Sequence, residues 1–340
     1  MPGVADLRRP ASVRILWLLA GVAVVLMLSA LSVSFGVRAV GVADILAALG
    51  GHDDTIGQAA IVKRIPRTLL AVLIGAALAI SGAAMQAVTR NPVADPGILG
   101  VSNGAALAVV CGLAFFGLTN PYGQMALAII GAAIAATFVY TVGSLGRGGA
   151  TPLKLALAGA ATSAAFASLI SAIMLPRVDM LMSFQSWQVG GVGGAEWPRI
   201  AIAAPVLAVG ALICVASARG MNSLALGDDM AAGLGEHVFR TRLVSALGAV
   251  ILAGSATALA GPIGFIGLIV PHACRMLVGT DHRWLLPFSA VTGSALLLAS
   301  DIIGRVIAPS SEEIQVGIIT AIIGAPLFIW IVRRQKVREL

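Results

Sequence analysis

Charged side chains are so sparse along this chain that long uncharged runs separate them. A charge near the centre of a bilayer costs about 2.5–3.5 kcal/mol on the insertion scale, and a helix needs about 20 residues to cross. Two runs are too long for one helix, and turns at Asn120-Pro121 and Gly261-Pro262 divide them. We therefore predict ten membrane-spanning helices, over residues 15–37, 68–89, 96–119, 122–146, 155–176, 200–218, 243–260, 262–274, 284–300 and 314–332.

The composition also indicates a membrane protein. Of the 340 residues, 59% are hydrophobic and 11% are charged, whereas a soluble domain usually carries about 25% charged residues. So few ionisable groups exclude an ordinary water-facing surface, and so apolar a chain is not disordered. The 40 glycines favour close approach of helices. We predict an all-α integral membrane protein with one transmembrane domain over residues 1–340.

The formal net charge of +7 would suggest a nucleic-acid partner in a soluble protein. Ten spans instead place both termini on one side of the membrane. When that side is taken as cytoplasmic, most of the 22 basic residues lie in inner segments, as the positive-inside rule requires. The charge is therefore interpreted as topology bias, and no nucleic-acid partner is expected.

Two local patterns predict where spans begin. Asp95-Pro96 is typical of an N-cap followed by a first-turn proline, and it is expected to open the third span. Ser310-Ser311-Glu312-Glu313 matches a capping box and is expected to open the tenth.

The longest inner loop, residues 217–242, predicts two short helices over 222–235. Asn222 or Ser223 would cap the first, and Asp228 would cap the second. Apolar side chains would be exposed on this loop, which favours a partner surface over a solvated connector. The residues of this surface are Ser223, Leu224, Leu226, Gly227, Asp228, Met230 and Leu234.

The topology disfavours basic residues on the outer side, and three of the arginines that it places there are singled out. Arg64 and Arg67 flank Pro66 before the second span, and Arg305 follows the ninth. A single arginine there would be explained by snorkelling to the interface. Three together suggest an acidic docking partner. An exposed ion pair is worth only about 0.2–1 kcal/mol. The arginines would therefore guide the approach of the partner and fix how it is aligned, more than they would strengthen its binding.

Two inner turns, residues 90–97 and 148–152, could narrow the inner mouth of a pore or simply connect spans. A weak internal repeat relates the stretch from Arg67 to Ala76 to the stretch from Arg242 to Ala249. The two stretches would run in opposite directions, as an inverted repeat requires.

Several chemistries have no residues to support them. The chain contains no Gly-x-x-x-x-Gly-Lys-Ser/Thr phosphate loop, so it cannot cradle nucleotide phosphates in that way. No acidic residue lies in the middle of a predicted span, and Asp301 lies near the end of one, so no proton or sodium relay is visible. This disfavours an ion-coupled secondary transporter. No nucleophile–base pair is visible, so an enzyme is disfavoured. The three cysteines and four histidines lack ligand spacing, and no cofactor or metal is expected on this chain.

Taken together, several motifs resemble the FecCD-type permease family of ABC importers for iron–siderophores, haem and cobalamin. They are Arg64–Leu69, Gly75–Gly82, Met85-Gln86, Asn91–Val101, Gly261–Leu268, Pro271-His272 and Gly324–Pro326. The resemblance implies a ten-helix fold like that of a cobalamin-importer permease. It also implies a bacterial inner-membrane protein whose cargo is an iron(III)-siderophore-type chelate, with haem or cobalamin as the alternative. Outside this resemblance, an ion-coupled secondary transporter is the more remote alternative.

The resemblance further implies partners and roles. The partners are a second permease subunit, usually identical, two cytoplasmic ATPases that bind ATP and Mg²⁺, and an extracytoplasmic binding protein. Arg64, Arg67 and Arg305 would contact the binding protein, and the 222–235 helices would be the coupling helices that contact the ATPases. A cytoplasmic gate would include Asn91, Val93, Thr151, Pro152 and Leu153.

Overall fold

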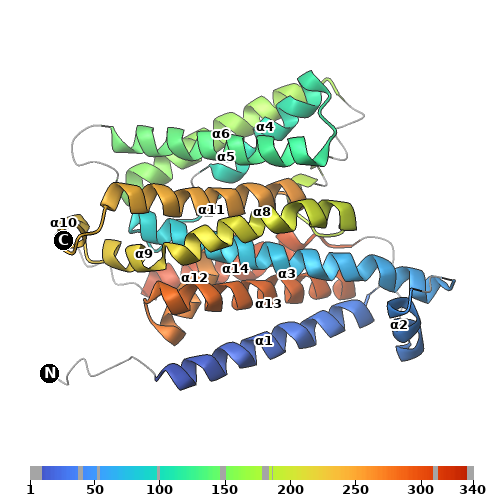
Figure 1. Ribbon diagram of the computed structural model, residues 1–340. Coiled ribbons are helices and arrows are strands. Elements are labelled where there is room, and N and C mark those ends of the chain that lie inside the picture. Colours follow the sequence, from blue (N-terminus) through green and yellow to red (C-terminus); the bar gives the residue numbers. More distant parts are fainter. Residues whose placement is uncertain are drawn as a thin grey trace.

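The computed structural model describes residues 10–36, 41–51, 54–97, 100–145, 151–177, 184–185, 187–308 and 313–334. These residues form a bundle of helices without strands (Figure 1). The helices are α1 (Ala11–Ser34), α2 (Val42–Leu49), α3 (Ile56–Thr89), α4 (Val101–Phe116), α5 (Pro121–Ser144), α6 (Pro152–Met174), α8 (Trp197–Ala216), α9 (Ala218–Leu224), α10 (Asp228–Gly233), α11 (Val238–Ala260), α12 (Ile266–Val278), α13 (His282–Ile307) and α14 (Val316–Arg334).

The all-helical membrane fold is confirmed. Within the described residues, seven helices are long and apolar enough to cross a membrane, namely α1, α3, α5, α6, α8, α11 and α13. The shorter helices α4, α12 and α14 are also apolar. Each of these helices overlaps one predicted span, whereas α2 and α10 lie outside the spans and α9 begins at the last residue of one. The protein is therefore a multi-pass membrane protein.

Some helices begin where local patterns did not predict. Asp95-Pro96 does not open α4, which begins at Val101 after Gly100 at φ 72°. Asp95 Oδ1 instead accepts a hydrogen bond from the backbone N–H of Gly97 at 2.7 Å, so its capping capacity serves a turn. The predicted capping box at 310–313 lies mostly outside the described residues, and α14 begins at Val316.

Helix α3 also begins earlier than the uncharged run suggested. A capping box of Thr55 and Gln58 opens it, and the helix continues through Pro66. Arg64 and Arg67 therefore lie on the helix itself and not in a connector before it. This placement decides which way their side chains point.

The centre of the bundle is built on backbone contacts between glycines. A Cβ on Gly75 would collide with the backbone of Gly293 on α13, and a Cβ on Gly82 would collide with the backbone of Gly267 on α12. Ser81 Oγ donates to the Ala249 carbonyl of α11 at 2.7 Å. Small residues allow this close approach where no hydrophobic effect drives helices together. Helix α3 is therefore held against three neighbours.

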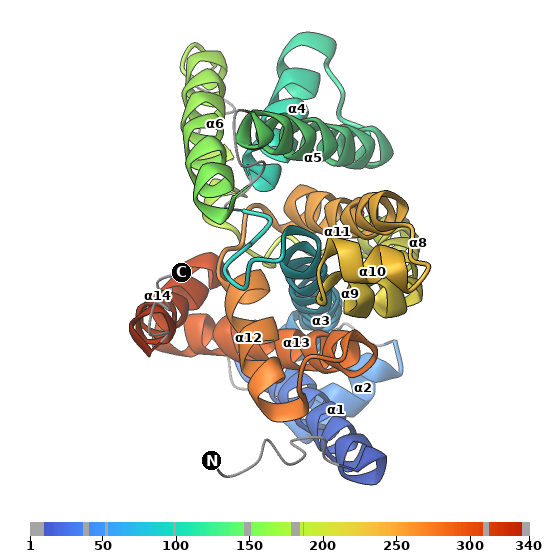
Figure 2. The ribbon, with the colours of Figure 1, turned by 90° about the vertical axis from the view of Figure 1, so that its left-hand side faces the viewer.

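Figure 2, an end-on view, shows how the helices are grouped. Helices α4, α5 and α6 form a layer on one side, α3, α8 and α11 lie in the middle, and α1, α12, α13 and α14 lie on the other side. Helix α3 runs from the end near α2 to the end near α9 and α10, and α11 runs back (Figure 1). The two helices of the expected repeat are thus antiparallel.

The glycine-rich stretch before α8 is bonded to protein on both sides. The N–H of Gly191 donates to the Ala260 carbonyl at 2.8 Å, and the Gly190 carbonyl accepts from the N–H of Gly317 at 3.0 Å. Irregular backbone at membrane depth is tolerated when protein satisfies its polar groups. This stretch therefore ties the end of α11 to the start of α14.

Candidate functional sites at the two ends of the bundle

Helices α9 and α10 lie together at one end of the bundle, the end that faces the viewer in Figure 2. This end is called the inner end below, and the end that carries α2 is called the outer end. Two short helices are present here, as predicted, but the first begins earlier, with Ser217 at its N-cap. The reason is that α9 follows α8 almost without a break, so the capping residues predicted at 222 and 223 lie inside the helix.

The short helices have a buried side and an exposed side. Met221 and Leu224 are fully buried, so the prediction that Leu224 is exposed is wrong. Leu226, Met230 and Leu234 are 58%, 62% and 66% exposed, respectively. Phe239, in the first turn of α11, is also exposed, and these four exposed apolar residues are called the inner apolar patch below. Such a cluster beside charged residues is typical of a protein-binding surface.

Asp228 connects the second short helix to its surroundings. It does not cap α10, because Gly227 is the N-cap and α10 begins at Asp228. Its Oδ1 instead accepts from Arg242 Nη2 on α11 at 2.8 Å and lies 3.5 Å from Arg90 Nη1. Arg90 is the C-cap of α3 and adopts φ 51°. The carboxylate therefore links α10 to the end of α3, directly before Asn91.

The predicted gate residues belong to two different turns of the chain. Asn91 is buried and its Oδ1 accepts from the N–H of the partly buried Val93 at 3.1 Å, which makes a compact turn after α3. Thr151 caps α6, since its hydroxyl accepts from the N–H of Lys154 at 3.4 Å, and Leu153 is exposed. Pro152 is the first residue of α6.

Among the described residues, the polar contacts of Asn91 and those of Thr151 are local to their own turns. The two halves of the predicted gate are therefore not bonded to each other within this chain.

At the outer end, Asp301 of α13 lies between two arginines. Its Oδ1 accepts from Arg67 Nε and Nη2 at 3.0 and 2.8 Å. Its Oδ2 lies 2.9 Å from Arg305 Nη2, one turn along the same helix. Arg67 also bonds Glu313, which precedes α14. The side chains of Asp301 and Arg305 are almost completely buried.

Two of the arginines bind the last turn of α1. Arg305 Nη1 donates to the carbonyls of Ser32 and Phe35 at 2.9 and 3.0 Å. Arg64 Nη1 donates to the carbonyls of Val33 and Ser34 at 3.1 and 3.3 Å. The last carbonyls of a helix lack partners within it and carry its negative dipole end. The arginines therefore satisfy and neutralise the C-terminus of α1.

These contacts correct the prediction that all three arginines are exposed on the outer surface. Arg64 and Arg305 are buried, and the Arg67 side chain is only 13% exposed. The physical reason is that acceptors from α1, α13 and the segment before α14 surround them. Sequence reasoning overlooked Ser32 and Glu313 as partners of these arginines. The one signal in the sequence was Asp301, an acidic residue near the end of a span. We call Arg64, Arg67, Asp301, Arg305 and Glu313 the outer charge cluster.

The inner end of α13 carries a second cluster that sequence reasoning overlooked. Asp281 caps α13 by accepting from the N–H of Arg283 at 3.1 Å. The Arg283 guanidinium also donates to its carboxylate, and Asn222 adds a bond from α9. The bonds from Arg283, with that from Asn222, lower the pKa of Asp281 to about 2.

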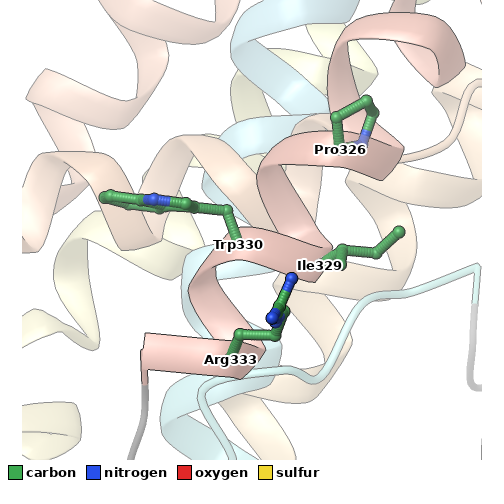
Figure 3. A pocket seen from close by; sticks show the side chains of 4 residues that line it. All are labelled: Pro326, Ile329, Trp330 and Arg333. Atoms are coloured by element: carbon green, nitrogen blue, oxygen red, sulfur yellow. The ribbon is translucent and has the colours of Figure 1, made fainter.

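A shallow pocket of about 510 Å³ lies on α14 and is lined by Pro326, Ile329, Trp330 and Arg333 (Figure 3). All four residues come from one helix. Figure 3 shows the Trp330 ring and the Ile329 side chain directed to different sides of the helix. One helix can form only one wall of a passage.

Comparison with known proteins gives consistent matches over nearly the whole chain. The model of the FecCD transport family matches residues 22–334. The chain is 43% identical to the ferric enterobactin transport system permease of Escherichia coli K12, over 90% of this chain and 92% of that one. It is 40% identical to the iron(3+)-hydroxamate import system permease of Bacillus subtilis 168, over 94% and 83%. Other relatives are named as citrate, haem and cobalamin permeases.

The fold also matches a solved structure. The TM-score is 0.77 at 29% sequence identity to a structure described as an inward-facing conformation of a metal-chelate type ABC transporter. The match covers 93% of this chain and 98% of that one.

Proposed function

The chain belongs to the FecCD transport family and is the permease subunit of an ABC importer, and from this premise we propose that its cargo is an iron(III)-siderophore-type chelate. The similarity to the ferric enterobactin and hydroxamate permeases supports this choice. Haem and cobalamin, named for other relatives, are the alternatives. Purifying the cognate binding protein and identifying the chelate that it retains tests the choice, and retained haem or cobalamin would overturn it.

The observation that carries the proposed mechanism is the inner apolar patch. Leu226, Met230, Leu234 and Phe239 are exposed at one end of the bundle, beside the Asp228 ion pairs. We propose that two cytoplasmic ATPases bind here and hold the ATP and Mg²⁺. Their closure would move α10 and, through Asp228 and Arg90, the turn at Asn91. Transport is then alternating access, with both termini cytoplasmic in a bacterial inner membrane.

Acidic substitutions in the patch test this assignment. Leu226→Asp with Met230→Asp should abolish co-purification of the ATPase and ATP-driven uptake in proteoliposomes, because the patch loses its apolar contact. The matched control is Leu145→Asp, since Leu145 is 66% exposed at the end of α5 and outside the patch. A double variant that retains the ATPase as well as the control does would refute the assignment.

At the outer end we propose that a carboxylate of the extracytoplasmic binding protein meets Arg67. Arg67 is paired with Glu313, and 39% of the Glu313 side chain is exposed, so this ion pair reaches the surface. Glu313 then competes with the incoming carboxylate. Arg64 and Arg305 hold the end of α1 in place beneath the docking surface.

Removing the competitor tests this docking site. Glu313→Gln should strengthen docking of the binding protein, and the gain should shrink at high salt because surface charges are screened. Glu196→Gln is the control, because Glu196 is paired with Arg199 at a separate exposed position. Unchanged or weaker docking in Glu313→Gln would remove Arg67 from the interface.

We further propose that the permease is a homodimer. The open pocket on α14 has one wall from this chain, and a second copy would provide the facing wall. The two halves of the cytoplasmic gate, Asn91 with Val93 and Thr151 with Pro152 and Leu153, would then be completed across two chains. Cross-linking through a cysteine placed at Ile329 would give covalent dimers if this is correct.

The outer charge cluster argues against the secondary-transporter alternative. A carboxylate that relays protons or sodium must change partner or charge during the cycle. Asp301 is instead fixed between Arg67 and Arg305, which contact its two oxygens, so neither oxygen is left open to a transported ion. Uptake driven by a proton gradient without ATP would contradict this interpretation.

A further inference from the structure

Helix α9 is bonded to the start of α13 through one side chain, Asn222. Its amide nitrogen donates to Asp281 Oδ1 at 2.7 Å. Its amide oxygen accepts from the backbone N–H of His282 at 2.9 Å and lies 2.7 Å from His282 Nδ1. The nitrogen and the oxygen of one side-chain amide thus both bond residues that lie about 60 positions away in the sequence.

Both sides of this junction are well anchored. On the α13 side, Asp281 is the N-cap and is bonded to Arg283, while His282 is 5% exposed. On the α9 side, Met221 and Leu224 are fully buried. The three bonds of Asn222 therefore join two packed elements and do not merely order a loose loop.

The junction creates a connection that the chain itself does not provide. Helix α9 is joined covalently to α8 on one side and to α10 and α11 on the other. Neither route leads directly to α13. Without Asn222, a movement of the short helices would reach α13 only through side-chain packing.

Helix α13 reaches from this junction to the outer charge cluster. Its 26 residues span about 39 Å at 1.5 Å per residue. Midway, Gly293 meets Gly75 of α3, and Ser294 Oγ donates to the Val72 carbonyl at 2.8 Å. Near its end, Asp301 and Arg305 bond α3 and α1. A displacement at Asn222 would therefore act on α3 and α1 as well.

We infer that Asn222 is a positioning residue for energy coupling, which makes α13 move together with the short helices α9 and α10. The inference rests on the proposed function, because it assumes that an ATPase moves those helices. It adds a direct route from the inner apolar patch to the outer charge cluster, so that both ends of the bundle respond to one displacement.

An exchange of the two side chains tests the inference. Asn222→Asp sets two carboxylates against each other, whereas Asn222→Asp with Asp281→Asn restores a donor facing an acceptor and keeps a capping oxygen at 281. In proteoliposomes that contain the ATPases and binding protein, Asn222→Asp should lower chelate uptake per ATP hydrolysed by about tenfold or more, the size expected from lost charge-assisted bonds. The exchange variant should recover most of it, with ATPase co-purification unchanged throughout.

The control is Ser217→Ala, which removes only a hydrogen bond to the Ile213 carbonyl at the end of α8 and should keep the uptake ratio. If Asn222→Asp does not fold, Asn222→Ala, which adds no charge, takes its place. An unchanged uptake ratio, loss of the ATPase, or no recovery in the exchange variant would each overturn the inference. Failure of the wild-type complex to transport with ATP would instead overturn the proposed function.

Discussion

Asp301 provides the sharpest test of the outer charge cluster. Asp301→Ala removes both hydrogen bonds to Arg67 and the ion pair with Arg305. Removing one partner of a buried ion pair costs about 3–5 kcal/mol, because the remaining charge is left uncompensated. Arg67 keeps Glu313 and Arg305 keeps the carbonyls of α1, so the lower end applies. We expect a loss of about 3 kcal/mol in the free energy of unfolding.

A loss of that size lowers the ratio of folded to unfolded protein by roughly 100-fold, at 1.4 kcal/mol per tenfold. In thermal unfolding of a chain of 340 residues it corresponds to a decrease in Tm of roughly 4 °C. Unfolding in detergent can be followed with a thiol-reactive dye, because Cys214 and Cys274 are buried in the folded protein. Asp301→Asn, which keeps the shape and loses the charge, should fall between the wild type and Asp301→Ala.

The control for this prediction is Glu313→Ala. The Glu313 side chain is 39% exposed and is paired with Arg67, so its loss should cost no more than about 1 kcal/mol. If Asp301→Ala destabilises the protein no more than Glu313→Ala does, the reasoning from burial is refuted.

Three further predictions use the same unfolding assay. Gly82→Ala should lower Tm clearly more than Gly233→Ala, because an added Cβ meets α12 backbone at 82 and nothing within 4 Å at 233; equal shifts would contradict the packing. Leu224→Asp should cost several kcal/mol of stability, because it buries an unpaired carboxylate. Leu226→Asp changes an exposed residue and should change stability by only about 0.5 kcal/mol. A larger loss of stability in Leu226→Asp than in Leu224→Asp would show that the exposed side was misassigned. The pKa of Asp281 is lowered from 3.8 to about 2, so the stability that the ionised carboxylate contributes is present above about pH 4 and is lost as pH falls toward 2. Asp281→Asn should therefore lower Tm more at pH 6 than at pH 2. An equal loss of Tm at both pH values would contradict that pKa.

The helices and their order could be predicted because those signals are local. A charge in a span is penalised wherever that span lies in the bundle, so uncharged runs mark helices without knowledge of their neighbours. Local patterns that predict where a helix begins were less reliable. Asp95-Pro96 resembles a helix start, yet the carboxylate bonds the next turn, and only the packed structure decides between the two.

The exposure of side chains could not be predicted in the same way. Leu224 and Leu226 are two residues apart in one apolar stretch, and they differ because α9 is packed against the bundle while the following turn projects from it. Arg305 and Arg64 are charged and near span ends, and they are buried because the end of α1 offers them carbonyls.

The sequence by itself determined that the chain is a multi-helix membrane protein and, through its motifs, which transport family it resembles. Only the tertiary structure decided which polar groups meet. Arg67 and Asp301 are 234 residues apart, and Asn222 and Asp281 are 59 apart. Pairs at such separations depend on which helices become neighbours, and glycine contacts such as Gly75 with Gly293 set that arrangement. The spacing of residues predicts which side chains share one face of a helix, but it does not predict which other helix packs against that face.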